Sequence, residues 1–336
     1  MSPVTFVVPA GVQDSRHPSG GNRFDVELAG ALRLAGWRAQ LAEVDAEAPD
    51  LGAVLAGRPA GEPVLVDGLL LERSPAWDPR EDRRVVPLLH MPPAADDAYV
   101  LLGRLDTVVT TSAWTRDRIR GRLPASTSTV VALPGVRPTR LVGTSPTGRR
   151  IRCVGALAPH KGQDVLLAAL GRIRHLAWRC ELVGATDIDP GFTRRIERLA
   201  AELGIADRVV LTGPRHANPV DGLYAGADLL VLPSRTESYG MAAAEALACG
   251  VPVIAADTGG VREAVDPTAG LLVRADDPVA LAAALGVWLS RADLRRRLTA
   301  AARQGSGHRR GWSSTAGIVA DVLAAAPATR QRTPGW

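Results

Sequence analysis

Two glutamates eight residues apart, Glu237 and Glu245, are the residues whose type and spacing best suit chemistry in this sequence. They lie in ESYGMAAAE, which predicts a helix from about Gly240 to Ala248. Eight helical residues cover ~12 Å and return the second side chain to nearly the same face. The free N–H groups at the helix start form an anion site between the two acids. Such a site suits a diphosphate flanked by hydroxyl groups, although two solvated glutamates, one of them stabilising the helix dipole, explain the pair equally well.

A lysine in a second loop offers a positive charge for the same anion. Lys161 lies in GALAPHKG, which follows an apolar strand and opens a helix. A lysine at this point can hold a phosphate as a point charge, and the alternative is an exposed loop lysine. The loop is not a Walker A loop, because the pattern GxxxxGK followed by Ser or Thr is absent.

Two further positions follow predicted strands and suit ligand binding. Gly20 and Gly21 join the first strand to the first helix and allow a ligand to approach the backbone, unless they only make a flexible connection. His90 ends the apolar strand in LLHMPP, where a structural histidine is the alternative. No histidine has metal-ligand spacing with another histidine or a cysteine. The stretch Asp187–Asp189 precedes a helix, so it is interpreted as a helix cap rather than a metal-binding motif.

Strand-length apolar runs alternate with helical patterns through both halves of the chain. In the first half the expected strands are Val4–Pro9, Arg38–Val44, Pro63–Val66, Val85–His90, Thr107–Thr110 and Thr129–Ala132. In the second half they are Ile151–Val154, Arg179–Val183, Val209–Leu211, Leu229–Leu232, Val251–Ala255 and Leu271–Val273. These repeated units predict two parallel-sheet α/β domains, with ligands bound at the carboxyl ends of the strands and in a cleft between the domains.

The length of the chain also favours two domains, because 336 residues exceed the size at which a single core keeps growing. We expect the first domain over residues 1–140 and the second over residues 148–308. The Pro- and Gly-containing segment Thr139–Thr147 is interpreted as the linker. A last helix is expected over residues 312–326, followed by a disordered tail over residues 327–336.

Composition limits the classes of partner. The chain is 46% hydrophobic and 22% charged, as in a globular protein, and no apolar run is long enough to cross a membrane. A net charge of +5 favours anionic ligands, but 4% aromatic residues and the lack of a binding motif argue against nucleic acid. The basic helix around Trp114 is interpreted as a solvated face, with contact to an anionic lipid or a phosphorylated acceptor as the alternative. Three cysteines without CxxC spacing and an N-terminus without a signal peptide indicate the cytoplasm.

Several segments taken together resemble one known family. ESYGMAAAE resembles the Glu-x7-Glu signature of the retaining glycosyltransferases of family 4, which have the GT-B fold. The loop with Gly20 and Gly21, the strand-end His90, VTTS and LPGV are similar to motifs of this family's first domain. GALAPHKG and GVPVIAADTGGVRE are similar to its VGRLxxxKG and GxPVIAxxxGGxxE motifs.

The chain departs from the family pattern at three points. Ala156 replaces the arginine of GRL, which normally shares the diphosphate with the lysine. The family's PNGVD is PGVR here, over residues 134–137, and the first domain is shorter than usual. The candidates to replace the missing charge are Arg152, Arg215 and Arg235.

The resemblance implies two facing Rossmann-like domains with a cleft between them and a last helix, residues 312–326, that crosses back onto the first domain. It implies that Lys161 and the helix start hold the diphosphate of a donor, that Glu245 binds its ribose and that Glu237 binds its sugar. Gly20 and Gly21 would close over the phosphates, while a strand-end histidine, His90, would contact the sugar near the reacting carbon. The other donor-binding residues that it implies are Ser238, Tyr239, Gly240, Met241 and Ala242.

The function that follows is retaining transfer of a hexosyl-type sugar from a UDP- or GDP-sugar to a hydroxyl acceptor. We expect it to need no metal or other cofactor, because Lys161 and the helix start neutralise the leaving diphosphate. A nucleotide-sugar epimerase of the same fold is one alternative. A weakly active or non-catalytic nucleotide-sugar binding protein is another, and Ala156 motivates it. No motif identifies the acceptor; a lipid acceptor would bring peripheral membrane association.

Overall fold

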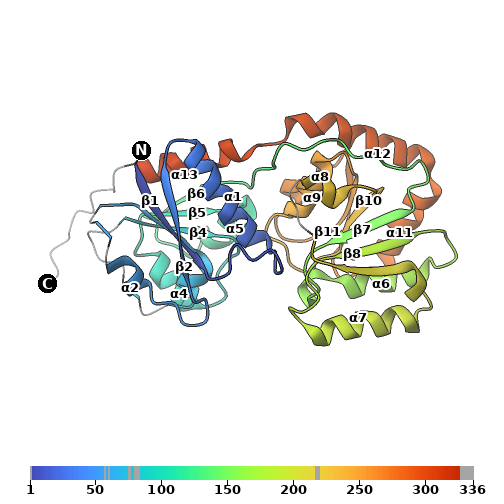
Figure 1. Cartoon of the computed structure of the whole chain (residues 1–336), viewed down its shortest axis with the longest axis horizontal. Coiled ribbons are helices and arrows are strands. Elements are labelled where there is room, and N and C mark those ends of the chain that lie inside the picture. Colours follow the sequence, from blue (N-terminus) through green and yellow to red (C-terminus); the bar gives the residue numbers. More distant parts are fainter. Residues whose placement is uncertain are drawn as a thin grey trace. The chain divides into compact units, whose positions relative to one another are not determined.

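The computed structural model describes residues 2–56, 58–59, 61–74, 77–78, 84–215 and 220–325. The chain divides into two compact units (Figure 1). Unit 1 comprises Met1–Val12, Phe24–Leu133 and Trp312–Trp336, and unit 2 comprises Gln13–Arg23 and Pro134–Gly311. Each unit contains one parallel sheet and its helices, which confirms the α/β class predicted from the sequence. The predicted tail, residues 327–336, lies outside the described residues.

Unit 1 is built on a six-stranded sheet in the order β2-β1-β3-β4-β5-β6, in which every neighbouring pair is parallel. The strands are β1 (Pro3–Pro9), β2 (Arg38–Val44), β3 (Val64–Asp67), β4 (Val85–Leu89), β5 (Thr107–Thr110) and β6 (Ser128–Val131). β1 is an inner strand, with Phe6 opposite Leu41 on β2 and opposite Leu65 on β3. Its apolar run is buried, as expected for a parallel strand that is covered on both faces.

The helices of unit 1 include three short ones that the sequence does not predict. These three, α2 (Leu51–Ala56), α3 (Gly68–Glu72) and α4 (Asp96–Leu102), are five to seven residues long, which is too short to show a helical repeat. The longer ones are α1 (Gly20–Leu34), α5 (Ala113–Arg120) and α13 (Trp312–Ala324). The start of α13 is fixed within unit 1, because Trp312 meets Phe24 edge to face, with ring centroids 5.2 Å apart. Thr315 Oγ1 also donates to the Leu133 carbonyl at 2.7 Å.

Unit 2 is built on a second six-stranded parallel sheet, in the order β12-β11-β10-β7-β8-β9. The strands are β7 (Arg150–Val154), β8 (Arg179–Val183), β9 (Val209–Gly213), β10 (Leu229–Leu232), β11 (Val253–Asp257) and β12 (Gly270–Arg274). The helices are α6 (Gln163–Arg172), α7 (Pro190–Glu202), α8 (Val220–Tyr224), α9 (Met241–Ala248), α10 (Val261–Ala264), α11 (Pro278–Ser290) and α12 (Ala292–Gly305). Because the order places β7 beside β10, the loops that follow these two strands emerge at the same edge of the sheet.

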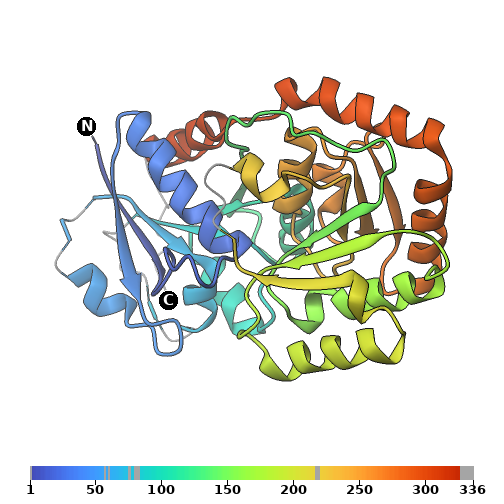
Figure 2. The ribbon, with the colours of Figure 1, turned by 45° about the vertical axis from the view of Figure 1, so that its right-hand side comes forward.

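Alternate residues of β10 face two helical layers. Leu229 and Val231 belong to the apolar core formed with α6, α7 and α11, whereas Leu230 and Leu232 belong to the core formed with α8 and α9. Figure 2 shows these helices on either side of the sheet. All four strand residues are buried, so the strand appears in the sequence as a continuous apolar run rather than an alternating one.

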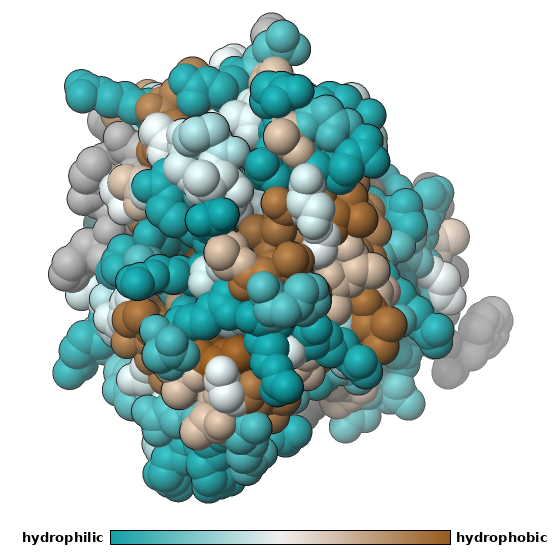
Figure 3. Space-filling view, turned by 90° about the vertical axis from the view of Figure 1, so that its right-hand side faces the viewer, coloured by the Kyte–Doolittle hydropathy of each residue, from teal (hydrophilic) through white to brown (hydrophobic). Residues whose placement is uncertain are grey.

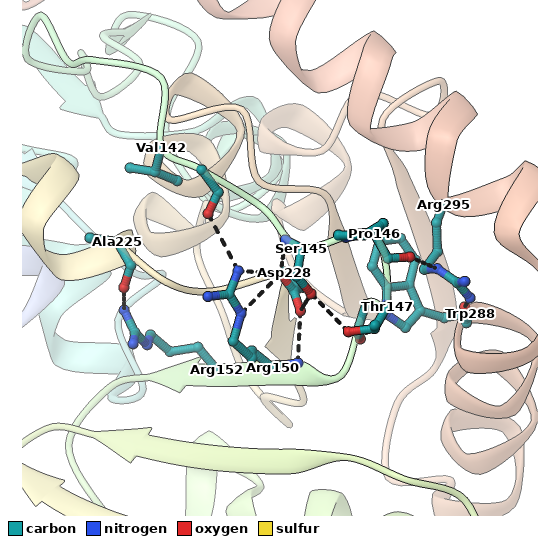
Figure 4. A network of polar contacts seen from close by, with 12 residues as sticks. Val142, Ser145, Pro146, Thr147, Arg150, Arg152, Ala225, Asp228, Trp288 and Arg295 are labelled. Carbon is teal, nitrogen blue, oxygen red and sulfur yellow. Dashed lines mark hydrogen bonds and ion pairs between the residues drawn. The ribbon is translucent and has the colours of Figure 1, made fainter.

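The predicted linker is fastened to unit 2, so the units divide at Leu133 and Pro134, ahead of the expected boundary near residue 140. The amide of Val142 donates to the Cys249 carbonyl at 2.9 Å. Buried Asp228 accepts hydrogen bonds from the Ser145 hydroxyl at 2.7 Å and from Arg150 Nη2 at 2.8 Å (Figure 4). Burial alone would raise the pKa of Asp228, but these hydrogen bonds lower it overall.

The described residues include no membrane-spanning helix and three buried thiols. No helix among them is long and apolar enough to cross a membrane. The face drawn in Figure 3 is largely hydrophilic, with apolar residues gathered in its middle. The three cysteines, Cys153, Cys180 and Cys249, are free and buried, as expected for core thiols.

Candidate functional site

The start of α9 has the backbone geometry of an anion site. Gly240 precedes the helix in the left-handed region, at φ 95°, and no side chain among the described residues caps the helix. The amides of Ala243 and Ala244 already donate to the Gly240 carbonyl. The N–H groups of the preceding residues, Met241 and Ala242, therefore remain for a ligand at the positive end of the helix dipole.

A glycine pair fixes the backbone that leads into this helix. A Cβ atom on Gly259 would lie 1.7 Å from the Glu237 carbonyl oxygen, and one on Gly260 would lie 2.0 Å from the Ser238 carbonyl oxygen. Gly259 is also left-handed, at φ 58°, and the Gly260 amide donates to the Glu237 carbonyl at 3.1 Å. In the sequence these glycines stand out only as part of the motif GVPVIAADTGGVRE. The structure shows that their lack of side chains lets the turn pack directly on the Glu237 segment.

Lys161 and Glu237 meet although they are far apart in the sequence. Lys161 Nζ lies 2.9 Å from Glu237 Oε2, and the Ser234 hydroxyl donates to the same oxygen at 3.2 Å. Both side chains are largely buried, with 25% of Lys161 and 15% of Glu237 exposed. The loops after β7 and β10 bring them together at the carboxyl edge of the sheet, where ligands bind in such folds.

Glu245 is held by two residues that belong to no motif in the sequence. Its side chain is 6% exposed and faces Tyr224 on α8, whose hydroxyl donates to Oε2 at 3.0 Å. Arg23 Nη1 lies 2.8 Å from Oε1 and 3.0 Å from Oε2. Burial and the charge of Glu245 raise the pKa of Tyr224 well above 10, so its hydroxyl remains a donor.

Gly20 and Gly21 are the first residues of α1, in the Gln13–Arg23 segment of unit 2. His17 fastens this segment, because its Nε2 lies 3.0 Å from Asp187 Oδ2. The hydrogen bond to Asp187, and then the one to Asp14, raises the pKa of His17. Nearby, Asp189 accepts from the Phe192 amide at 2.8 Å and caps α7, which confirms the interpretation of that motif as a helix cap.

His90 follows β4 in unit 1 and forms a buried cluster with two carboxylates. Its Nε2 lies 3.0 Å from Asp25 Oδ1 and 3.7 Å from Asp67 Oδ2. Phe24 packs edge to face on the imidazole, with ring centroids 5.3 Å apart. Burial alone would lower the pKa of His90, but the charge and hydrogen bond of Asp25, together with the charge of Asp67, outweigh it and raise the pKa to about 9. His90 is therefore an imidazolium at neutral pH.

The same three residues are a group whose geometry could hold a metal ion. One donor atom from each of Asp25, Asp67 and His90 lies within 4.8 Å of the others. Burial raises the pKa of Asp25 to about 7, and its Oδ2 has no partner among the described residues. Asp67 Oδ1 is already used, because it accepts from the Leu69 amide at 2.7 Å and caps α3. The sequence gives no sign of this cluster, since its members come from three separate segments.

The arginines considered as replacements for the charge missing at Ala156 are engaged elsewhere. Arg152 is buried and donates to Glu181 at 2.6 Å, and Arg215 also pairs with Glu181, at 3.4 Å. Arg235 binds Asp164 through two nitrogens, at 2.9 and 3.0 Å. These contacts direct all three guanidinium groups to structural carboxylates. Arg23 contacts Glu245 as Lys161 contacts Glu237, so each of the two acids is paired with a cation.

Residues 143–305 match the family described as glycosyl transferases group 1. A D-inositol 3-phosphate glycosyltransferase of Xylanimonas cellulosilytica is 42% identical over 175 residues, which cover 51% of this chain and 40% of that protein. One of Geodermatophilus obscurus is 37% identical over 235 residues, which cover 62% and 50% of the two chains. The chain thus spans about half the length of the curated relatives it matches.

Solved structures show the same fold over nearly the whole chain. Sucrose-phosphate synthase from Thermosynechococcus elongatus superimposes with a TM-score of 0.82 at 21% identity, over 96% of this chain and 98% of that one. HepE of Anabaena, solved in complex with UDP-glucose, gives a TM-score of 0.79 at 20% identity, over 96% and 100%. The resemblance inferred from the motifs is thus confirmed over residues 143–305, which match the group 1 glycosyltransferases, and the chain has the GT-B fold.

Proposed function

We propose that the protein is a retaining glycosyltransferase that moves a hexosyl-type sugar from a UDP- or GDP-sugar to a hydroxyl acceptor without a metal ion. Unit 2 would bind the donor, and unit 1 would bind the acceptor. The observation that carries the proposal is the pairing of Glu237 with Lys161 and of Glu245 with Arg23. The two glutamates are close in sequence to the uncapped start of α9. Each acid is neutralised and oriented before any ligand arrives, as preorganised binding requires.

The diphosphate of the donor would lie at the start of α9. The backbone from Ser238 to Ala242 would surround it, and the N–H groups of Met241 and Ala242 would donate to its oxygens. Lys161 would turn from Glu237 to the diphosphate as a compact positive charge. The charge that develops on the leaving diphosphate would then be stabilised by fixed groups, so that no metal is needed.

The two acids would bind hydroxyl groups on either side of the diphosphate. Lys161 and Ser234 both contact Oε2 of Glu237, and Oε1 has no hydrogen bond among the described residues. Oε1 would accept from hydroxyl groups of the donor sugar. Glu245, held by Tyr224, would accept from the ribose hydroxyls. Hydroxyl donors keep a buried carboxylate hydrogen-bonded, so this exchange satisfies the site.

Retention of configuration would follow from attack on the same face of the sugar. The leaving diphosphate would take the proton of the acceptor hydroxyl as the new bond forms. His90, as an imidazolium, would contact the sugar near the reacting carbon, and Gly20 and Gly21 would close over the phosphates. Neither role requires a residue to form a covalent intermediate.

The acceptor is best sought among small phosphorylated polyols. The relatives in Xylanimonas and Geodermatophilus are named D-inositol 3-phosphate glycosyltransferases, and an acceptor of this kind would suit a chain of net charge +5. The basic helix α5 makes a lipid acceptor the alternative. Arg118 and Trp114 of this helix are already in contact with each other, because the Arg118 guanidinium carbon lies 5.1 Å from the Trp114 ring centroid. Action in the cytoplasm, where buried thiols stay reduced, is part of the proposal.

Nucleotide-sugar epimerisation and simple donor binding are the competing functions, the second because Ala156 lacks the family's charge. The test incubates the protein with UDP-glucose or GDP-mannose, with and without D-inositol 3-phosphate, and follows the sugar anomeric signals by proton NMR. Transfer predicts free nucleoside diphosphate and a glycoside of retained configuration, only when acceptor is present. An epimerised sugar from donor alone would favour an epimerase. Donor binding without release of nucleoside diphosphate for any acceptor would reject transfer.

A further inference from the structure

Arg23 approaches Glu245 in a way that leaves most of its guanidinium unused. A single nitrogen, Nη1, contacts both carboxylate oxygens, at 2.8 and 3.0 Å. Among the described residues, Nε and Nη2 of Arg23 make no hydrogen bond. Two parallel N–H bonds to one carboxylate would occupy a whole edge of the guanidinium. The end-on contact instead leaves an edge available for a second anion.

The position of Glu245 places this edge close to the start of α9. Glu245 follows Met241, the first residue of the helix, by one helical turn. One turn spans about 5.4 Å along the axis, so a guanidinium on the Glu245 carboxylate lies within reach of an anion held by the first N–H groups. The planar guanidinium of Arg23 matches the geometry of a phosphate, which accepts two N–H bonds from it.

The charges around the site are short of one cation for a diphosphate. Lys161 is present, but Ala156 carries no charge, and Arg152 and Arg235 are engaged with Glu181 and Asp164. We propose that Arg23 is the second cation of the donor site, neutralising Glu245 in the unliganded protein and binding the diphosphate once ribose hydroxyls occupy Glu245. The inference rests on the proposed function, because it needs a nucleoside-diphosphate ligand at α9.

The exchange leaves every charged group with a partner. Glu245 keeps the hydroxyl of Tyr224 and gains the hydroxyls of the ribose, while Arg23 passes from a carboxylate to a phosphate. Arg23 also lies in the first turn of α1, which begins at Gly20 and Gly21. Its contact with the diphosphate would therefore hold the glycine segment against the donor, and the segment would be fixed by the ligand as well as by His17.

Binding calorimetry with nucleoside diphosphates and nucleosides tests the assignment. The probes are UDP, GDP and ADP, together with uridine, guanosine and adenosine, titrated into the full chain. Arg23→Ala should raise the Kd of the preferred nucleoside diphosphate by about 10- to 100-fold, the effect of losing a charge-assisted hydrogen bond. It should leave the Kd of the matching nucleoside unchanged or lower, because the ribose no longer competes with Arg23. Arg23→Lys keeps the charge but not the planar shape, so its Kd for the nucleoside diphosphate should lie between those of the wild type and Arg23→Ala.

A second substitution, in the loop that contains Ala156, separates a binding role of Arg23 from a structural one. Ala156→Arg in the Arg23→Ala background should recover most of the lost diphosphate affinity, since it restores the charge at its usual place in the family. Arg16→Ala removes an exposed arginine from the same segment, one that pairs with Asp14, and should leave every Kd unchanged. Circular dichroism confirms that each variant is folded.

Three results would overturn the assignment in distinguishable ways. If wild type binds a nucleoside diphosphate and Arg23→Ala binds it equally well, the role of Arg23 is rejected while the proposed function stands. If nucleoside and diphosphate affinities fall equally, and Ala156→Arg recovers nothing, Arg23 only supports Glu245. If wild type binds none of the three nucleoside diphosphates, the proposed function fails together with the role of Arg23.

Discussion

Replacing Asp25 by asparagine tests how His90 is kept positively charged. Asp25 Oδ1 lies 3.0 Å from His90 Nε2, and its charge and hydrogen bond, with a smaller contribution from the charge of Asp67, outweigh burial and raise the pKa of His90 to about 9. Asparagine preserves the shape of the side chain but removes its charge. Burial should then dominate, and the pKa of His90 should fall to its ordinary value of about 6.5 or below. A fall of about 2.5 pKa units corresponds to about 3 kcal/mol of lost charge stabilisation.

The substitution should also change how stability depends on pH. The pKa of His90 is raised on folding, so its contribution to stability is complete below about pH 6.5 and is lost as the pH rises through about 9. Burial raises the pKa of Asp25 to about 7, so the cost of ionising it is already present at pH 7 and above. Between pH 7 and 9, the free energy of unfolding should therefore fall more steeply in the wild type than in Asp25→Asn.

NMR titration of the His90 ring nitrogens, from about pH 5 to pH 10, measures the effect directly. Asp14→Asn is the matched control, because it removes a carboxylate 3.1 Å from another histidine, His17, and leaves the His90 cluster intact. The control should lower the pKa of His17 and leave that of His90 unchanged. If His90 titrates at the same pH in Asp25→Asn and in the wild type, Asp25 does not keep the imidazole charged.

Three further predictions concern Tyr224, Gly259 and the need for a metal ion. Tyr224→Phe should lower the free energy of unfolding by about 1.5–3 kcal/mol, because buried Glu245 loses a donor, whereas Tyr239→Phe should change it by less than about 0.5 kcal/mol in urea titrations. Gly259→Ala should cost about 2 kcal/mol or more, since its Cβ would lie 1.7 Å from the Glu237 carbonyl oxygen; Gly286→Ala, in the open interior of α11, should stabilise by about 0.5–1 kcal/mol. Excess EDTA should leave turnover unchanged in the NMR assay, and a loss of turnover that added Mg²⁺ or Zn²⁺ restores would contradict a metal-independent reaction.

Much of the architecture could be predicted because short stretches of the sequence determine each strand and each long helix. The apolar run Leu229–Leu232 predicts a buried parallel strand, and the structure has a strand at those residues. Gly240 and Gly250 bracket the expected helix, which the structure places at Met241–Ala248. Strands and long helices repeat such signals over many residues, whereas α2, α3 and α4 are too short to show one.

The partners of the site residues could not be predicted, because they depend on packing between distant segments. Lys161 and Glu237 both stood out in the sequence, but their contact follows from β7 lying beside β10, which no local pattern fixes. Arg23 belongs to no motif of the sequence and only follows the Gly20 and Gly21 pair. The one signal that could have drawn attention to Arg23 is its position near the glycine pair, where its guanidinium can donate hydrogen bonds to a bound anion. Asp25 is equally inconspicuous, since an acid on an amphipathic helix is usually solvated, and here it is fully buried.

Calorimetric titration with UDP- and GDP-sugars tests whether the start of α9 and the two acids form a nucleotide-sugar site. One of these sugars should bind the wild type with one site per chain. Glu245→Gln and Lys161→Ala should each weaken that binding by about 10- to 100-fold while the proteins stay folded. Absence of binding to every UDP- and GDP-sugar, or equal affinity in wild type and both variants, would show that α9 and these side chains do not form a nucleotide-sugar site.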